Sequence, residues 1–299
     1  IRNAFVADSS CRLIVADYSQ MEMCIMAHFS QDEYMLEAIN SGLDLHAYTA
    51  SRMLGLPYEH ILAAKVLNDL DWDIQGSVQS LSSKLRIKPK DCSILLDEIS
   101  AEYAGDLLIA RANAKAIGFG MIYGMGPGKL SDNLKVSIKE AKDLIKAWFE
   151  AFPKVRVFMD DMRRAAEYRE DHTVFTLFGR PRRLHSILSD NKGKAAKAGR
   201  EAINAPIQGS ASCIVKLAMK LIDQDPILGG DCLEGGSAGC GMLLQIHDEL
   251  VLELDTRNKT EEEISCIVDR MKKIMRECVE LAVPLKTSGG IALSWGEAK

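Results

Sequence analysis

The segment Arg111–Gly124, RANAKAIGFGMIYG, is the feature that most constrains the fold. Its Arg111, Lys115, Phe119 and Tyr123 recur at intervals of four, so they share one face only if the segment is helical. Two cations followed by two aromatic rings suit a ligand that is polyanionic at one end and flat at the other, such as a nucleoside triphosphate. The alternative is a partly buried amphipathic helix whose cations extend to solvent.

The charge of the chain is unevenly distributed. The 299 residues carry a net charge of −5 and are 47% apolar, enough to bury a substantial core in two subdomains. Residues 111–220 contain 21 Lys and Arg against 11 Asp and Glu, a net +10, so the remainder carries −15. A basic middle within an acidic chain is typical of a surface that contacts phosphates, although a solvated basic face has the same composition.

The eight cysteines form no CxxC pair, which indicates neither a zinc site nor a disulfide framework. Buried, reduced thiols are the expected state. No apolar run approaches the roughly 20 residues that span a bilayer, and no signal peptide is visible. We therefore expect an intracellular protein, of the cytoplasm or nucleoid, an organelle or a virus-infected cell, without a membrane partner.

Short apolar runs predict the strands. Residues 12–16, RLIVA, predict a buried strand that ends just before Asp17. In residues 242–254, MLLQIHDELVLEL, two apolar runs flank a turn that carries acids. TVFTLFGRPRRL at 173–184 predicts a short hairpin with a basic arm, and IALSW at 291–295 predicts a last strand.

Helical spacing of apolar residues predicts that most of the remaining chain is helical. The segment 44–55 should end as a helix at Gly55, and two amphipathic helices should meet at Pro153. A long helix at 193–223 should be interrupted near Pro206. Further predicted features are a helical elaboration at about 60–108 whose segments are joined by a Ser-rich basic stretch (77–90), a Gly-rich loop (228–241) and a closing helix (261–281).

Asp17 and Asp248, each beside a predicted strand, indicate a site for a hard cation. Mg²⁺ favours a few carboxylate oxygens together with substrate phosphates and water. Two such ions about 4 Å apart can bind the attacking and leaving oxygens of a phosphoryl displacement. An aspartate at the end of a strand is also a common turn residue. Glu249 favours the metal interpretation because adjacent acids at a buried turn are costly without a cation, whereas His247 alone fits a structural hydrogen-bonding residue.

Six segments together resemble the family A DNA polymerases, the group of bacterial DNA polymerase I and its phage, organellar and eukaryotic relatives. LIVADYSQMEM (13–23) resembles motif A, RANAKAIGFGMIYG motif B and LLQIHDELVLE (243–253) motif C. The segments DLHAYTA (44–50), FGRPRRL (178–184) and REAINAPIQGSA (200–211) follow in the family's order. The resemblance covers nearly the whole chain except about 60–108.

The resemblance implies a role for each matching residue. Asp17 and Asp248, with the Tyr18 carbonyl, would bind two Mg²⁺ ions, for which Mn²⁺ can substitute, and Glu249 would assist catalysis. Lys115 would bind the triphosphate and donate a proton to the departing pyrophosphate. The other nucleotide contacts would come from Gln20, Glu22, His46, Arg111, Phe119 and Tyr123. Contacts to primer and template would come from Arg200, Asn204, Gln208 and His247.

The resemblance also implies an α+β fold, a right-hand palm with an antiparallel sheet and a mainly helical fingers region. The palm would comprise residues 1–25 and 206–299, and the fingers residues 26–205, including the insertion at about 60–108 and the motif B helix at 111–124. We expect no thumb or exonuclease domain in this chain, so that such regions would lie upstream or on another chain.

The implied function is DNA-directed DNA polymerase activity on a DNA primer–template, with dNTPs as substrates and pyrophosphate as product. One alternative is a single-subunit RNA polymerase, which shares the Arg, Lys and Tyr-Gly of motif B; Glu22 and the His-Asp-Glu of motif C favour DNA synthesis. A second alternative is a nucleic-acid-binding module without catalysis. Retention of Asp17, Lys115 and Asp248 argues against it, because binding alone requires no such set.

Overall fold

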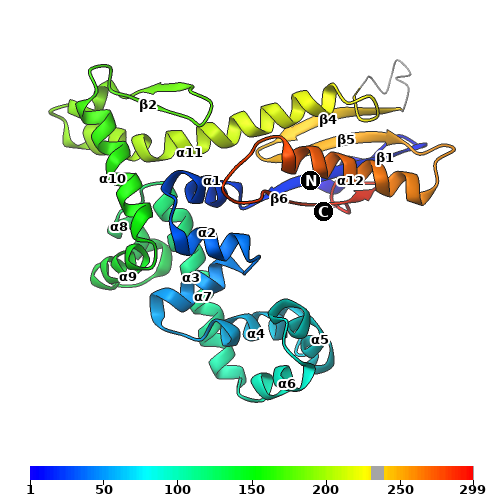
Figure 1. Ribbon diagram of the computed structural model, residues 1–299, viewed down its shortest axis with the longest axis horizontal. Coiled ribbons are helices and arrows are strands. Elements are labelled where there is room, and N and C mark those ends of the chain that lie inside the picture. The colour runs from blue at the N-terminus through cyan, green and yellow to red at the C-terminus, as the bar shows by residue number, and fades with distance from the viewer. Residues whose placement is uncertain (230–238, 299) are drawn as a thin grey trace. The chain divides into compact units, whose positions relative to one another are not determined.

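The computed structural model describes residues 1–229 and 239–298. It contains an antiparallel sheet with helices and a second, mainly helical part, which confirms the predicted α+β class (Figure 1). The chain divides into two compact units. The sheet unit comprises Ile1–His28, Val174–Arg182 and Ala205–Lys299, and the helical unit comprises Phe29–Thr173 and Arg183–Asn204.

The sheet unit is organised around its central strand β1. The strands are β1 (Cys11–Ser19), β4 (Cys240–Ile246), β5 (Glu249–Asp255), β6 (Lys286–Ser288) and β7 (Ile291–Ala292), in the order β4-β5-β1-β6 with β7 also pairing with β1. All the pairings are antiparallel, and Asp17 lies opposite Glu249. The apolar run at 13–16 is buried because both faces of β1 are covered.

Different elements cover the two faces of this sheet. Helix α12 (Glu261–Glu277), which begins with a capping box at Thr260, packs against β1 and β6 (Figure 1). A second cluster contains Leu13, Val15 and Val251 together with Trp295 from the end of the chain. The predicted strand–turn–strand and closing helix are therefore confirmed.

Helix α11 (Lys192–Asp223) continues through Pro206, so the predicted interruption is wrong. A proline removes one hydrogen bond from a helix interior and is tolerated when packing stabilises both flanking turns. Here Ala202, Ile203 and Ile207 are fully buried. The Ser210 hydroxyl also donates a 2.5 Å hydrogen bond to the Pro206 carbonyl.

The helical unit has the long helix α7 (Ala101–Ile122) at its centre, packed against α3 (Leu45–Leu54) and α4 (Tyr58–Asp69). Small buried residues such as Ala47, Ala110 and Ala114 allow this close packing. The other helices are α2 (Glu33–Asn40), α5 (Ile74–Leu85), α6 (Pro89–Asp97), α8 (Pro127–Leu134), α9 (Ile138–Ala151) and α10 (Pro153–Tyr168).

The remaining elements of the described chain are one helix, one hairpin and two 3₁₀ helices. Helix α1 (Met21–Ser30) follows β1, and a hairpin forms from β2 (Thr173–Phe175) and β3 (Pro181–Arg183), as predicted. Two 3₁₀ helices are η1 (Arg2–Ala4) and η2 (His185–Leu188). The helix ends at Gly55 and before Pro153 also match the prediction.

Two other predictions need correction, and a third is not tested. The Ser-rich stretch 77–90 is largely helical, because α5 extends to Leu85 and buries Leu81. The last strand is only the two residues of β7, after which Ser294 forms a bridge to Val6. Most of the predicted Gly-rich loop, 230–238, lies outside the described residues.

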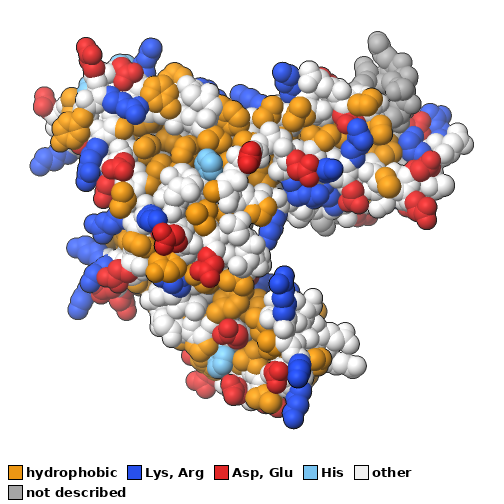
Figure 2. All heavy atoms as spheres, in the orientation of Figure 1, with side chains coloured by type: hydrophobic (Ala, Val, Ile, Leu, Met, Phe, Trp, Pro, Cys, Tyr) orange, Lys and Arg blue, Asp and Glu red, His pale blue; other side chains and the backbone are white. Residues whose placement is uncertain are grey.

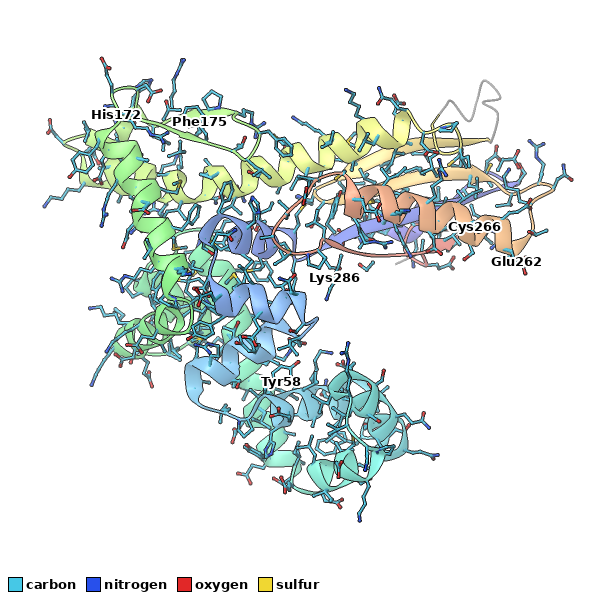
Figure 3. All side chains as sticks on the ribbon, in the orientation of Figure 1. Tyr58, His172, Phe175, Glu262, Cys266 and Lys286 are labelled. Atoms are coloured by element: carbon cyan, nitrogen blue, oxygen red, sulfur yellow. The ribbon has the colours of Figure 1, made fainter. Side chains whose placement is uncertain are left out.

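The cysteines are only partly buried. Among the seven described cysteines, all free thiols, Cys24, Cys92 and Cys240 are buried, whereas Cys266 lies exposed on α12 (Figure 3). The prediction of reduced thiols agrees with this arrangement, but the prediction of general burial does not. An exposed position on an amphipathic helix tolerates a cysteine, so the presence of a cysteine does not by itself predict burial.

The surface of the helical unit carries interspersed charges. Figure 2 shows Lys and Arg side chains alternating with Asp and Glu over α9 and α10. Several of these cations have an acid one turn away on the same helix, including Lys146, Arg156, Arg163 and Arg164. Within the described residues, no helix combines the length and apolar content that crossing a membrane requires.

Replacement of Asp32 by Ala should lower the free energy of unfolding by about 2–3 kcal/mol. The Asp32 carboxylate is fully buried and accepts hydrogen bonds from the backbone N–H groups of Met35, in the first turn of α2, and Lys154, in the first turn of α10. Urea denaturation measures the change. Ser137→Ala, which removes an exposed capping box, is the control and should cost only about 1 kcal/mol. Equal losses in the two variants would contradict the bridging role of Asp32.

Candidate active site

The sheet unit brings the two predicted metal ligands together. Asp17 lies near the end of β1, and Asp248 lies in the two-residue turn between β4 and β5, where His247 adopts a left-handed conformation with φ of 56°. The Tyr18 N–H donates a 3.2 Å hydrogen bond to the Asp248 carbonyl. This bond joins the tip of the hairpin to the strand that carries Asp17.

The two carboxyl groups are close enough to interact directly. Burial, and then the neighbouring Asp17 carboxylate, raise the pKa of Asp248 above its ordinary value, and a hydrogen bond between the two side chains contributes further. Two acids held together favour either a shared proton or a bound cation. Their oxygens fit a hard divalent ion such as Mg²⁺, which completes its coordination with substrate phosphates and water. No group of three or more His, Cys, Asp or Glu side chains placed to hold a metal occurs in the described part of the chain.

Tyr18 can offer only its backbone carbonyl to a metal. Its ring is buried, and its hydroxyl donates a 2.6 Å hydrogen bond to the Met275 carbonyl on α12. Burial raises the pKa of this phenol, so the hydroxyl stays protonated. The side chain therefore fixes the strand against α12 beside Asp17.

Glu249 lies beside Asp248 but has structural partners. Its carboxylate is 2% exposed and accepts a 2.7 Å hydrogen bond from Trp295 Nε1. The Arg2 guanidinium lies 3.5 Å from the same carboxylate and 4.8 Å from the centre of the Trp295 ring. These contacts compensate the burial of the charge. The predicted catalytic role of Glu249 stays a prediction.

The other predicted residues of the sheet unit lie on nearby turns and helices. Gln20 is exposed between β1 and α1 with φ of 53°, and its carbonyl accepts hydrogen bonds from the Met23 and Cys24 N–H groups. Glu22 lies in the first turn of α1. Gln208 on α11 and His247 in the turn are both exposed.

In the helical unit, α7 presents the predicted phosphate-binding residues beside the start of α3. Arg111 pairs with Asp44, the residue that caps α3, at 2.7 Å between Nη2 and Oδ2. Lys115, one turn further along α7, is exposed. The rings of Phe119 and His46 lie 5.8 Å apart at 46°. The structure thus brings His46, Arg111 and Phe119 together around the first turn of α3.

His46 is uncharged at neutral pH. It is 3% exposed, and burial together with the Arg111 and Lys115 charges lowers its pKa to about 4, although Asp44 acts in the opposite direction. A neutral imidazole contributes a hydrogen bond rather than a positive charge. Any positive charge that this group of residues offers to a phosphate therefore comes from Arg111 and Lys115.

A second group of predicted residues surrounds the end of α7. Tyr123 follows the last residue of the helix and is exposed. With Met125, Lys129 and Arg200 it lines a cavity of about 260 Å³. Gly124 is required here because its φ is +64° and a Cβ atom would lie 2.9 Å from Arg200 Cγ. Asn204, one turn after Arg200 on α11, is half-buried.

Asp44 is a site residue that the sequence reasoning missed. It opens the segment DLHAYTA, and an aspartate before an apolar-periodic run is a signal for a helix cap. Its pairing with Arg111, 67 residues away, leaves no such local signal.

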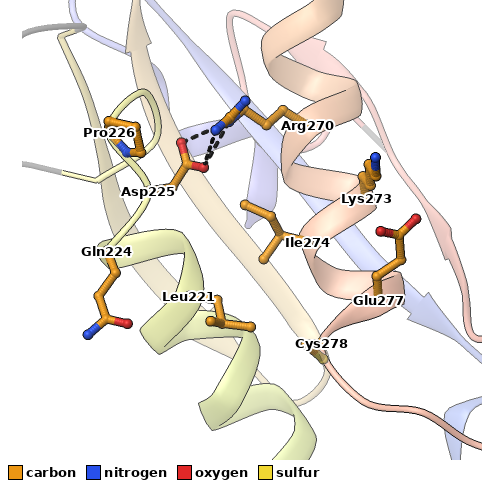
Figure 4. Close-up of a pocket in the computed structure, with 9 residues that line it drawn as sticks. All are labelled: Leu221, Gln224, Asp225, Pro226, Arg270, Lys273, Ile274, Glu277 and Cys278. Atoms are coloured by element: carbon orange, nitrogen blue, oxygen red, sulfur yellow. Dashed lines mark hydrogen bonds and ion pairs between the residues drawn. The ribbon is translucent and has the colours of Figure 1, made fainter.

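The sheet unit also contains a groove of about 500 Å³ between the end of α11 and α12 (Figure 4). Asp225 pairs there with Arg270 at 2.7 Å and caps the turn after α11 by accepting from the Ile227 and Leu228 N–H groups. No predicted site residue lines this groove. The pair of Asp225 and Arg270 joins the turn after α11 to α12, which is a structural role.

The sequence match of the whole chain decides its family. The model of DNA polymerase family A matches residues 1–105 and 108–297. The chain belongs to DNA polymerase family A. The match includes most of residues 60–108, so the resemblance extends further than the six motifs indicated.

This family A chain is similar to several bacterial proteins. It is 35% identical over 300 residues to DNA polymerase I of Streptococcus pneumoniae serotype 4 and 32% identical over 299 residues to DNA polymerase I of Lactococcus lactis subsp. cremoris. Each alignment covers 100% of this chain and 28% of the relative. The chain thus spans little more than a quarter of the length of these relatives.

A solved structure with the same fold confirms the polymerase architecture. It is described as the POL domain of Pol1 from M. smegmatis in complex with DNA primer-template and dNTP, and it shares 32% sequence identity with this chain at a TM-score of 0.73. The alignment covers 100% of this chain and 42% of that one. The predicted fold, a palm sheet with mainly helical fingers, is therefore confirmed, and members of this family are metal-dependent enzymes.

Replacement of Asp248 by Asn should stabilise the metal-free protein at pH 7, by up to about 1 kcal/mol, because it removes one of two adjacent like charges. An acid with a raised pKa stabilises the fold at low pH and loses that contribution as the pH rises through the raised value. The gap between variant and wild type should therefore close as the pH falls toward about 4. Thermal unfolding in EDTA between pH 4 and 7 tests this.

Asp255→Asn is the matched control for this prediction. The Arg257 side chain and N–H lower the pKa of Asp255 to about 2, so its charge stabilises the fold at pH 7 and its loss should have the opposite sign. A lower melting temperature of Asp248→Asn than of the wild type at pH 7 would contradict the proximity of two like charges.

Proposed function

We propose that this chain catalyses template-directed DNA synthesis, adding deoxynucleoside triphosphates to a primer 3′ end and releasing pyrophosphate. The observation that carries the proposal is the hydrogen bond from the Tyr18 N–H to the Asp248 carbonyl, which, with Asp17 opposite Glu249, places Asp248 beside Asp17 at the hairpin of the sheet in a family A chain. The similar mycobacterial structure is a complex with DNA primer-template and dNTP, which supports the same two partners here.

Asp17 and Asp248 would bind two Mg²⁺ ions, or Mn²⁺ in their place, with the Tyr18 carbonyl as a further ligand. Bound metal would stabilise the negative charge that develops on the attacking and leaving oxygens. The chain's own contribution is to hold both carboxylates at one point of a rigid sheet. Glu249 would support this point from its buried position beside Asp248, without direct contact to the substrate.

The helical unit would supply the nucleotide contacts. Arg111 and Lys115 would bind the triphosphate, and Lys115 would donate a proton to the departing pyrophosphate. The neutral His46 would donate a hydrogen bond to a phosphate oxygen. Phe119 would pack on the sugar and base, and Tyr123 would stack near the templating base.

We assign residues 1–25 and 206–299 to the palm and residues 26–205 to the fingers, with a helical elaboration at about 60–108. The division into two compact units supports this assignment, except that residues 174–182 group with the sheet. Contacts to primer and template would come from Gln208, Arg200 and Asn204 of α11 and from His247 in the turn between β4 and β5. Gln20 and Glu22 would complete the nucleotide site from the palm.

Asp17→Asn and Asp248→Asn should each lower the rate of nucleotide addition by roughly a thousandfold or more, because the lost ligand acts mainly in the transition state. Binding of primer–template should stay within about twofold. Single-turnover extension in Mg²⁺ and fluorescence anisotropy of labelled duplex measure the two quantities. Asp255→Asn, at the far end of β5, is the control and should retain the wild-type rate. Near-normal extension by either site variant would refute the metal assignment.

Glu22→Ala should raise incorporation of ATP relative to dATP, by about a hundredfold or more. A fixed carboxylate beside the sugar excludes a 2′-hydroxyl by a clash, which exceeds the discrimination of a merely apolar pocket. Single-turnover kcat/KM for both nucleotides on one primer–template gives the ratio. Glu262→Ala changes another first-turn helix glutamate, exposed on α12 (Figure 3), and should leave the ratio unchanged. If both variants behave alike, Glu22 is an ordinary helix residue favoured by the helix dipole.

A further inference from the structure

Asp44 makes two kinds of contact that the proposed function does not use. Its Oδ1 atom accepts hydrogen bonds from the His46 N–H at 3.1 Å and the Ala47 N–H at 3.0 Å, which caps α3. Its own N–H donates to the Tyr58 hydroxyl at 3.1 Å, from the start of α4 (Figure 3). These hydrogen bonds fix both the backbone and the carboxylate of Asp44 before any ligand binds.

The same carboxylate holds Arg111 by one edge of its guanidinium. Arg111 Nε lies 3.2 Å from each Asp44 oxygen, and Nη2 lies 2.7 Å from Oδ2. The two side chains are only 21% and 16% exposed, so water screens the pair poorly. Burial alone would raise the pKa of Asp44, but the hydrogen bonds from Arg111 and the Ala47 N–H lower it, so the carboxylate is charged at neutral pH.

This geometry leaves the opposite edge of the guanidinium for another acceptor. The Nε and Nη2 groups face Asp44, whereas Nη1 has no hydrogen-bond acceptor among the described residues. A guanidinium can bind one acid along each edge because its N–H donors lie in a plane. A phosphate can thus bind Arg111 without displacing Asp44.

Asp44 also couples the two predicted phosphate contacts. By capping α3 it sets the backbone of His46, and by pairing with Arg111 it sets the cation on α7. Both groups are thus oriented by one anchored carboxylate. An arginine that is already oriented loses less side-chain entropy when an anion binds to it.

We propose that Asp44 is a positioning residue for the triphosphate site: it holds Arg111 by the Nε edge so that the Nη1 edge faces a nucleotide phosphate. The proposal rests on the proposed function, since it takes Arg111 as a phosphate ligand. It adds that the affinity for the nucleotide depends on an acid that does not itself contact the nucleotide.

Asp44→Asn separates the helix-capping role of Asp44 from its charged pair with Arg111. Asparagine caps a helix about as well as aspartate, so α3 should stay intact, but the charged pair with Arg111 is lost. We expect the Kd for dATP to rise about tenfold. The rate at saturating dATP should change by less than about twofold, since the contact is made equally in ground and transition states. Calorimetry with a dideoxy-terminated primer–template in Mg²⁺ measures binding without turnover.

Two controls identify the cause of any change. Asp73→Asn alters another aspartate that caps a helix, α5, by accepting from the Gly76 N–H, and it should leave dATP binding unchanged. In an Arg111→Ala background, Asp44→Asn should have no further effect, because its action passes through Arg111. A purely structural role of Asp44 would instead give the same loss in both backgrounds.

The outcomes separate the two proposals. If the wild-type chain binds dATP and Asp44→Asn binds it equally well, the positioning role is wrong while the proposed function stands. Tighter binding by Asp44→Asn would show that Asp44 competes with phosphate for Arg111, which also overturns the role. If the folded wild-type chain binds no dATP in Mg²⁺ with primer–template, the proposed function itself fails.

Discussion

The pairing of β1 with β5 is the constraint on which the candidate active site depends. Their antiparallel register places Asp17 opposite Glu249, and the Tyr18 N–H bonds to the Asp248 carbonyl at the hairpin tip. The two neighbouring carboxylates are an unfavourable pair, because burial and the like charge of Asp17 raise the pKa of Asp248. The backbone ladder and the apolar residues on both faces of β1 therefore hold an unfavourable pair in place, as expected of a preorganised site.

The two units organise their charged residues in different ways. In the sheet unit the acids lie side by side, and the compensating contacts go to Glu249, which Trp295 and Arg2 bind. In the helical unit, two cations lie near the start of α3. Asp44 holds one edge of the Arg111 guanidinium, and the Lys115 side chain is exposed to solvent. The sheet unit is thus suited to binding cations and the helical unit to binding anions. Nucleotidyl transfer requires both kinds of site.

The sequence predicted those features that leave a local pattern. The apolar run before Asp17, the turn at Asp248 and the stripe from Arg111 to Tyr123 each follow from periodicity within a short segment. The predicted interruption of the helix at Pro206 was wrong, because burial of the neighbouring residues outweighs the local cost of a proline. The partners of Arg111 and Glu249 could not be predicted, since they lie 67 and 46 residues away and depend on tertiary packing.

The two-residue turn at His247 and Asp248 has a consequence for how the site can vary. Strand side chains alternate between faces, so one residue added to this turn would shift the register of β5 and exchange the residues on its two buried faces. Length changes at the turn are therefore incompatible with the buried Leu250, Val251 and Leu252, whereas substitutions there leave the ladder intact. The length of the connection that presents Asp248 is thus set by the strands on either side of it, independently of the side chains that it carries.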